Sequence, residues 1–327
     1  MRLCYLSLLF LLIISCGASK EEEVERALVS ASNALTESDC DAAINSLASV
    51  SYQTDNAEYV KLYASAYACL AGYKTTTFFD QDITKISGSN ILSEFTTFTL
   101  AQRNESGVID ASFQNMQTAI DALMYSSGIP TSTNPTSALR NQEFSNAETA
   151  EINSLLFYLI VNQLGSYFYF YGNTNSTGVK GGGDIAGQNC LYSYNIDGGG
   201  AIDTALTAYL SNDNTGGACN SVGLTGSSQL TNGAVMNVSR ACRAITLFNA
   251  FFDTFENITV ASIGEDDLQT VFDAINTLLD NAGTYGFSDS SILSVTSQTL
   301  CETNFASNDR DLQLFFGFVF EALHNKQ

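Results

Sequence analysis

Apolar positions recur every three or four residues along most of the chain, which is the spacing that places side chains on one face of an α-helix. The pattern is clearest in 235–258, at Val238, Ala241, Cys242, Ile245, Phe248, Phe252 and Phe255. The same spacing predicts helices over 21–35, 38–47, 56–72, 107–126, 143–171, 265–282 and 309–323. We therefore predict an all-α fold, built as a helical bundle or as an irregular array of helical hairpins.

Polar residues at the ends of the first three predicted helices support these boundaries. Glutamates 21–23 open the first helix, where negative charge interacts favourably with the helix dipole. Ser38 or Asp39 can cap the second helix and Asn56 the third, because their side chains accept hydrogen bonds from free backbone N–H groups. Gly72 is a typical C-terminal stop for the third helix.

The segment 152–171 is long and apolar, so a transmembrane span is one interpretation. It contains Asn153, Asn162 and Gln163, whose polar groups a helix facing lipid would have to satisfy internally. A buried central helix is the favoured interpretation.

Residues that break helices gather in two places. Both prolines, Pro130 and Pro135, lie in the polar stretch 128–136, which we interpret as a connection. Glycines gather in 172–233, which predicts a glycine-rich loop region closed by a disulfide. We predict one helical domain over 21–327, with possible lobes at 21–172 and 190–327.

The first residues indicate export. After Met1 and Arg2, an apolar run extends from Leu3 to Ile14 with one interruption. A hydrocarbon core of ~30 Å requires roughly 20 apolar residues, so this run is too short to span a bilayer and is typical of a signal peptide. Its end, Ile13-Ile14-Ser15-Cys16-Gly17, resembles the lipobox of bacterial lipoprotein precursors.

The lipobox resemblance implies a signal peptide at 1–15, acylation of Cys16, and a tether at 16–20 that holds the protein to a membrane of the bacterial cell envelope. Gly17 in place of aspartate favours the outer membrane under the rule of enteric-type bacteria. An ordinary secretory signal remains open. A eukaryotic secreted protein would carry glycosylation candidates at Asn104, Asn175, Asn237 and Asn257.

Composition supports a folded, acidic protein. Hydrophobic residues make up 45% of the chain, enough for a substantial core, and the formal net charge is −21. Such acidity disfavours nucleic acid, whose binding needs a basic surface, and it also disfavours direct adsorption to anionic lipid. Membrane attachment would then depend on the lipid at Cys16.

Beyond Cys4 and Cys16 the chain has an even number of cysteines, which in an exported protein favours three disulfides. They are Cys40, Cys69, Cys190, Cys219, Cys242 and Cys301. We predict that Cys40 pairs with Cys69, because both lie on one candidate helical hairpin. The pairs Cys190–Cys219 and Cys242–Cys301 are our choice for the rest. No two of these cysteines form the Cys-x-x-Cys pair that is typical of zinc or redox sites.

The stretch 39–73 reads DCDAAINSLASV, a short connection, then NAEYVKLYASAYACLAGY. It resembles a tetratricopeptide-type helical hairpin, in which small residues such as Ala64 and Ala66 let two helices approach while tyrosines and leucines fill the groove. A second copy at the expected period is not evident. An ordinary helical hairpin pinned by a disulfide explains the pattern equally well.

Few residues in the sequence indicate a catalytic or metal-binding site. The single histidine, His324, lies near the C-terminal end, where we expect a fraying tail rather than a catalytic triad. Two carboxylates would suffice for a glycosidase, but no pair is singled out. Oxygen ligands at Asp184, Asn195 and Asp197 beside glycines could hold calcium, although a surface loop is the favoured interpretation. We predict no metal ion and no cofactor.

Four tyrosines around the glycine-rich region are candidates for a ligand cleft: Tyr167, Tyr171, Tyr192 and Tyr194. Core packing is the competing role. The features together favour a non-enzymatic protein-interaction module, anchored by lipid, whose partner is another envelope protein. A lipoprotein that captures a sugar or small molecule is the first alternative, and a carboxylate-based hydrolase is the second.

Overall fold

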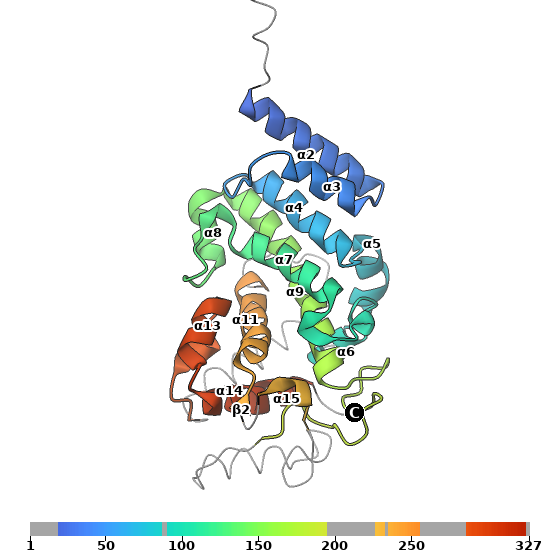
Figure 1. Ribbon diagram of the computed structural model, residues 1–327, viewed down its shortest axis with the longest axis vertical. Coiled ribbons are helices and arrows are strands. Elements are labelled where there is room, and N and C mark those ends of the chain that lie inside the picture. The colour runs from blue at the N-terminus through green and yellow to red at the C-terminus, as the bar shows by residue number, and fades with distance from the viewer. Residues whose placement is uncertain (1–18, 87–89, 195–225, 233–234, 256–285, 325–327) are drawn as a thin grey trace, which may run out of the picture.

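The computed structural model describes residues 19–86, 90–194, 226–232, 235–255 and 286–324 (Figure 1). The protein is mainly helical, which confirms the predicted class. Within the described ranges, strands occur only in the short antiparallel hairpin of β1 (Thr231–Asn232) and β2 (Val235–Met236). This hairpin was not predicted. Its second strand occupies the first residues of the helix predicted over 235–258, so the predicted start is wrong, and the helix α11 (Val238–Phe255) begins three residues later.

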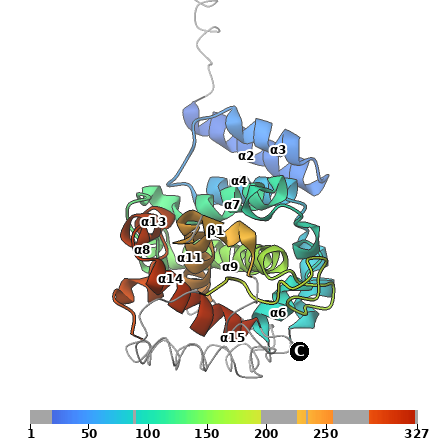
Figure 2. The ribbon, with the colours of Figure 1, turned by 60° about the horizontal axis from the view of Figure 1, so that its bottom comes forward.

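The N-terminal helices form successive antiparallel hairpins. Helix α2 (Lys20–Thr36) packs on α3 (Cys40–Ala48), which packs on α4 (Ala57–Leu70), and α4 packs on α7 (Ala111–Met124). Figures 1 and 2 both show α2 and α3 at one end of the molecule, with α4 and α7 as the next layer. These helices correspond to the first four predicted ones.

Their ends follow the predicted signals. Asp39 and Asn56 accept hydrogen bonds from the first turns of α3 and α4. Gly72 adopts a φ of +87° directly after α4, and its amide donates to the Cys69 carbonyl. Glycine suits this left-handed position because it has no Cβ to clash.

The centre of the molecule is α9 (Asn146–Tyr171), which packs against α11 (Val238–Phe255), α7 and the short α6 (Ile91–Thr96). A capping box of Ser145 and Glu148 starts α9. Most of its residues from 152 onward are buried, which confirms the prediction of a buried central helix. Among the described residues, no helix combines the length and apolar character needed to cross a bilayer.

Several short elements were not predicted. Between α4 and α9 they are α5 (Thr75–Thr77), the π-helix η1 (Phe78–Asp82), the 3₁₀ turns η2 (Ile83–Lys85), η3 (Ala101–Arg103), η4 (Gly107–Ile109) and η5 (Ser126–Gly128), and α8 (Ser137–Glu143). Later ones are η7 (Ser228–Leu230), η9 (Ser290–Leu293) and α13 (Gln298–Phe305).

The predicted helix over 309–323 is present but irregular. It consists of α14 (Asp309–Phe315), the π-helix η10 (Phe316–Phe320) and α15 (Glu321–Leu323) in direct succession. The predicted helix over 265–282 lies outside the described residues. Short and irregular turns carry too few periodic apolar positions to be recognised in a sequence.

Two clusters of buried apolar side chains hold the fold together. The larger joins α4, α6, α7, α9, α11, α13 and α14, and so draws on both of the sequence ranges suggested as lobes. The smaller cluster packs α2, α3 and α4 on one another through Ala31, Ala43, Leu47, Tyr59 and Ala66.

Disulfides connect helices in both clusters. Cys40 at the start of α3 pairs with Cys69 at the end of α4, with Cα atoms 5.6 Å apart. Cys242 on α11 pairs with Cys301 on α13 at 5.7 Å. Both predicted pairs are confirmed. Cys190 is also disulfide-bonded, and its predicted partner, Cys219, lies outside the described residues.

Candidate binding groove

A hollow on the protein surface lies where α2 begins. The Ser19 side chain accepts from the Glu22 amide at 3.2 Å, and the Glu22 carboxylate accepts from the Ser19 amide at 2.9 Å. This reciprocal capping box satisfies two backbone donors and fixes the first residue of the helix. The glutamates at 21 and 23 consequently stand in the first turn, beside the positive end of the helix dipole.

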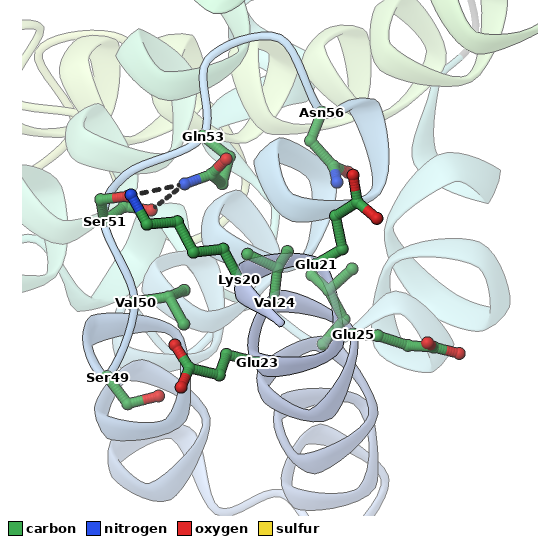
Figure 3. Close-up of a pocket in the computed structure, with 11 residues that line it drawn as sticks. Lys20, Glu21, Glu23, Val24, Glu25, Ser49, Val50, Ser51, Gln53 and Asn56 are labelled. Atoms are coloured by element: carbon green, nitrogen blue, oxygen red, sulfur yellow. Dashed lines mark hydrogen bonds between the residues drawn. The ribbon is translucent and has the colours of Figure 1, made fainter. Parts of the chain in front are cut away.

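We define the α2 groove as the hollow between the first turns of α2 and the connection 49–56 that joins α3 to α4 (Figure 3). Its volume is about 560 Å³ and it opens to solvent. The lining residues are Lys20, Glu21, Glu23, Val24, Glu25, Leu28, Ser49, Val50, Ser51, Gln53 and Asn56. A second hollow of about 410 Å³ continues along α2 and α3 and shares Glu23, Ser49 and Val50 with the first.

The α2 groove has an apolar floor. Val24, Leu28 and Val50 are half-buried, and Figure 3 shows Val24 on α2 and Val50 in the connection that faces it. In the connection, the Gln53 amide donates to the Ser51 carbonyl at 2.5 Å and to the Ser51 hydroxyl at 2.9 Å. These bonds give the polar wall a defined conformation.

The rim of the α2 groove is negatively charged. Glu21, Glu23 and Glu25 are exposed, and Lys20 extends from the helix start toward the connection (Figure 3). Three carboxylates against one ammonium leave an excess of negative charge over the apolar floor. A partner segment carrying lysine or arginine together with an apolar side chain would complement both features.

A row of tyrosines lies next to the connection. Tyr52 is 46% exposed, and its ring meets those of Tyr59 and Tyr63 edge to face at centroid distances of 5.4 and 5.0 Å. Burial, together with the neighbouring Tyr59, raises the pKa of Tyr52 to about 12, so its hydroxyl stays neutral at physiological pH. Aromatic side chains with one exposed face are common anchors in protein interfaces.

The walls of the α2 groove are held together by the smaller core cluster. The Tyr59 hydroxyl on α4 donates to the Leu47 carbonyl on α3 at 3.2 Å, in a buried position. The Cys40–Cys69 disulfide joins the far ends of the same two helices. The α3–α4 pair therefore forms the antiparallel hairpin expected over 39–73, while its tetratricopeptide resemblance stays a prediction.

The four tyrosines proposed for a ligand cleft lie elsewhere. Tyr167, Tyr171 and Tyr192 are buried in the larger core, and Tyr194 packs against it. The Tyr167 hydroxyl donates to the Arg240 carbonyl at 3.0 Å, and the Tyr171 hydroxyl accepts from the Val108 amide at 3.3 Å. They pack as core residues, and the walls of the α2 groove are formed by other side chains.

The described part of the glycine-rich region is pinned to α15 by a buried ion pair. Lys180 and Glu321 are fully buried and hydrogen-bonded to each other. Glu321 also accepts from the Leu191 amide at 2.7 Å and from the Tyr194 hydroxyl at 2.8 Å. Of the calcium candidates, Asp184 is exposed, and Asn195 and Asp197 lie outside the described residues.

The expectation of a fraying tail at His324 is wrong. This side chain is fully buried, its ring packs on Phe168, and its Nε2 atom lies 3.2 Å from the Thr174 hydroxyl. Burial, assisted by the nearby Lys180 charge, lowers the pKa of His324 well below its usual value. The apolar contacts of the last helical turn outweigh the tendency of chain ends to fray.

Sequence reasoning missed the connection 49–56, which it treated only as a link between helices. Its polar residues lie between two helices that fold back on each other, and the glutamate run at 21–23 is distant from it in sequence. Only the packing of α2 on α3 brings the two segments together. Cys16, the predicted lipidation site, lies outside the described residues.

Neither a metal site in the described residues nor a known relative assigns a function to this protein. Across the ranges that the structure describes, no three histidine, cysteine, aspartate or glutamate side chains are grouped as a metal ion would require. Comparison with protein-family models, with curated proteins and with solved structures finds no significant match.

Proposed function

We propose that this chain is a lipid-anchored protein of the bacterial cell envelope that works as a non-enzymatic interaction module. The α2 groove, with its apolar floor and acidic rim, is the observation that carries this proposal. Its partner would be another envelope protein that presents a basic and apolar segment. The acylated residue would be Cys16, and Gly17 after it favours the outer membrane.

The short distance along the chain from Cys16 to the groove supports the proposal. Only Gly17 and Ala18 separate Cys16 from Ser19, which caps α2. Fully extended residues span at most ~3.6 Å each. The Cα atom of Ser19 would therefore lie within about 11 Å of the Cα atom of the acylated Cys16. A partner bound in the α2 groove would then be held close to the membrane surface.

Disulfides supply independent support for export. Cys40–Cys69 and Cys242–Cys301 are formed, and stable structural disulfides are typical of oxidising compartments. Asn104, one candidate for glycosylation in a eukaryotic host, is buried, and its amide donates to the Ser166 carbonyl at 3.0 Å. A glycan on this side chain would displace that bond.

The anchor is tested by metabolic labelling with a palmitate analogue. We expect label on the native protein and none on Cys16→Ala, which should leave the membrane fraction. Labelling that persists in Cys16→Ala would refute the anchor while leaving the binding role of the α2 groove untouched.

The groove is tested by crosslinking in intact envelopes with matched variants of α2. Glu23→Lys and Val24→Asp should each abolish the main crosslinked adduct, because they reverse the rim charge or place a charge on the floor. Glu37→Lys and Val29→Asp are the controls, since Glu37 is exposed at the other end of α2 and Val29 is 57% exposed. Equal adduct yields in all four variants would exclude the α2 groove as the binding site.

A further inference from the structure

A small cavity lies at the opposite end of α4 from the α2 groove. Its volume is about 90 Å³, and it is enclosed by the turn 72–74 after α4, the π-helix η1, the segment 99–103 and α9. We call it the η1 cavity. Space of this size is enough for a few water molecules or for one small polyatomic ion.

Two cationic side chains line the η1 cavity. Lys74 and Arg103 both line it and both are exposed. Neither side chain forms an ion pair or a hydrogen bond with any residue that the structure describes, whereas Lys61, Lys85 and Lys180 are all paired with carboxylates. Lys20, Arg26 and Arg240 also form no ion pair with the described residues, but Lys74 and Arg103 are the two that line one cavity together.

Arg103 lies close to the turn 72–74 that follows α4. A Cβ atom on Gly72 would lie 3.4 Å from an Arg103 guanidinium nitrogen, so the guanidinium rests against the bare glycine backbone. A planar guanidinium is suited to two parallel hydrogen bonds with an oxyanion.

A buried hydroxyl supplies the second observation. Tyr73 also lines the η1 cavity. Its hydroxyl oxygen is shielded from bulk solvent and forms no well-aligned hydrogen bond with the described residues, although the Thr75 side chain lies near it. Buried hydroxyl groups are nearly always paired, because an unpaired one loses its bonds to water without replacement. An acceptor bound in the η1 cavity would satisfy this donor.

The one carboxylate of the η1 cavity is already compensated. Asp82 Oδ1 accepts from Lys85 Nζ at 2.8 Å, and from the Thr99 amide and hydroxyl at 3.0 Å each. Lys85 balances the charge of Asp82, so Lys74 and Arg103 leave an excess of positive charge. A cation would be repelled by this arrangement, and an anion would be attracted.

We propose that the η1 cavity binds a small oxyanion, such as phosphate or the carboxylate of a larger molecule. Lys74 and Arg103 provide its charge complement, and the Tyr73 hydroxyl donates a hydrogen bond to it. This site is separate from the α2 groove and does not depend on the lipid anchor.

Calorimetric titration of the folded chain with inorganic phosphate tests the site, with sodium chloride at equal ionic strength as the reference. Lys74→Gln and Arg103→Gln should each weaken phosphate binding about tenfold, because each removes a charge-assisted contact. The double variant should show no binding above the chloride reference. Arg26→Gln, an exposed cation on α2, is the matched control and should bind phosphate like the native chain.

Tyr73→Phe separates binding from folding. The variant keeps the aromatic ring and loses a hydroxyl that forms no well-aligned hydrogen bond with the described residues, so it should stay folded yet bind phosphate more weakly. Parallel titration with acetate distinguishes a tetrahedral oxyanion, for which phosphate binds more tightly, from a carboxylate, for which the two are equal. Absence of binding by the native chain, or undiminished binding by the double variant, would overturn the proposal.

Discussion

Two ion pairs with a buried cation link residues that are far apart in sequence. Arg140 on α8 meets Asp253 on α11 at 3.3 Å, and its exposed fraction is only 1%. Its guanidinium also donates to the Asn153 side chain at 2.9 Å, and burial lowers its pKa to about 10. Such groups keep their charge because each has several partners, which compensates the loss of hydration.

Breaking the Lys180–Glu321 pair should be severe. Lys180→Met leaves the Glu321 carboxylate buried without its cation, so we expect a loss of about 3–5 kcal/mol in the free energy of unfolding. Lys61→Met is the control, because Lys61 pairs at the surface with Glu58 and Glu151 and should cost at most about 1 kcal/mol. Urea unfolding measures the loss of stability in both variants. Equal losses would show that burial of the ion pair does not determine how much its removal destabilises the protein.

His324 should make stability sensitive to mild acid. Its pKa is depressed in the folded protein, where Lys180, Thr174 and Phe168 surround it, so the unfolded chain binds the proton first. Stability is therefore complete above the ordinary pKa of 6.5 and falls as the pH drops below it, toward the folded pKa.

At one pH unit below that value, the loss should be about 1.4 kcal/mol. Because His324 is the only histidine, unfolding of His324→Gln at pH 7.5 and 5.5 provides the comparison. A decrease of equal size in the variant would assign the pH dependence to other groups.

At the scale of helices, the fold depends on one close approach in its centre. Gly165 of α9 lies directly on the backbone of α6, and a Cβ atom there would be 2.9 Å from the Phe95 carbonyl carbon and would overlap its oxygen. The sequence shows only an isolated glycine in an apolar helix. Its role as a contact point between two helices is visible only in the packed structure.

Gly165→Ala should therefore destabilise the protein by about 1–3 kcal/mol through overpacking, although alanine favours helix formation. Ser154→Ala, at a half-buried position of the same helix where the hydroxyl bonds the Ala150 carbonyl, should change stability by less than about 0.5 kcal/mol. Thermal unfolding of both variants gives the comparison. A neutral or stabilising Gly165→Ala would mean that α6 can move away freely.

The Cys40–Cys69 disulfide should stabilise mainly the end of the molecule that carries the α2 groove. It closes a separation of 29 residues, for which the chain-entropy model gives about 3–4 kcal/mol. In the double variant Cys40→Ala, Cys69→Ala, amide exchange in α2 and α3 should accelerate while that in α9 changes little, because local unfolding does not require the larger core to open.

Cys242→Ala combined with Cys301→Ala is the reference, since these buried cysteines belong to the larger core. It should accelerate exchange in α9 and α11. Uniform acceleration in both double variants would show that the two core clusters unfold as one.

At the scale of the whole molecule, charge opposes compaction. With 34 acidic and 13 basic side chains, the chain repels itself at low ionic strength. Adding potassium chloride should raise the unfolding temperature, most steeply below about 0.15 M, where screening lengths are longest. A decrease with salt would indicate that attractive surface pairs dominate instead.

The sequence predicted the helical class, the first four helices, the buried α9 and two disulfides, because these features are local or follow from the repeat of apolar positions. It missed η1 and η10, since a single π turn of five residues is too short to produce a recognisable repeat of apolar positions. The burial of His324 was also missed, because the segments that cover it lie far away in sequence.

By itself, the sequence determined the helix positions, the acidic charge, the pairing of Cys40 with Cys69 and the expectation of a lipid-bearing Cys16, because each depends on neighbouring residues or on composition. Only the tertiary structure decided which polar residues meet. The α2 groove needs α2 folded against the connection 49–56, and the η1 cavity needs Lys74 beside Arg103. Such meetings depend on how whole helices pack, which no single segment of the sequence specifies.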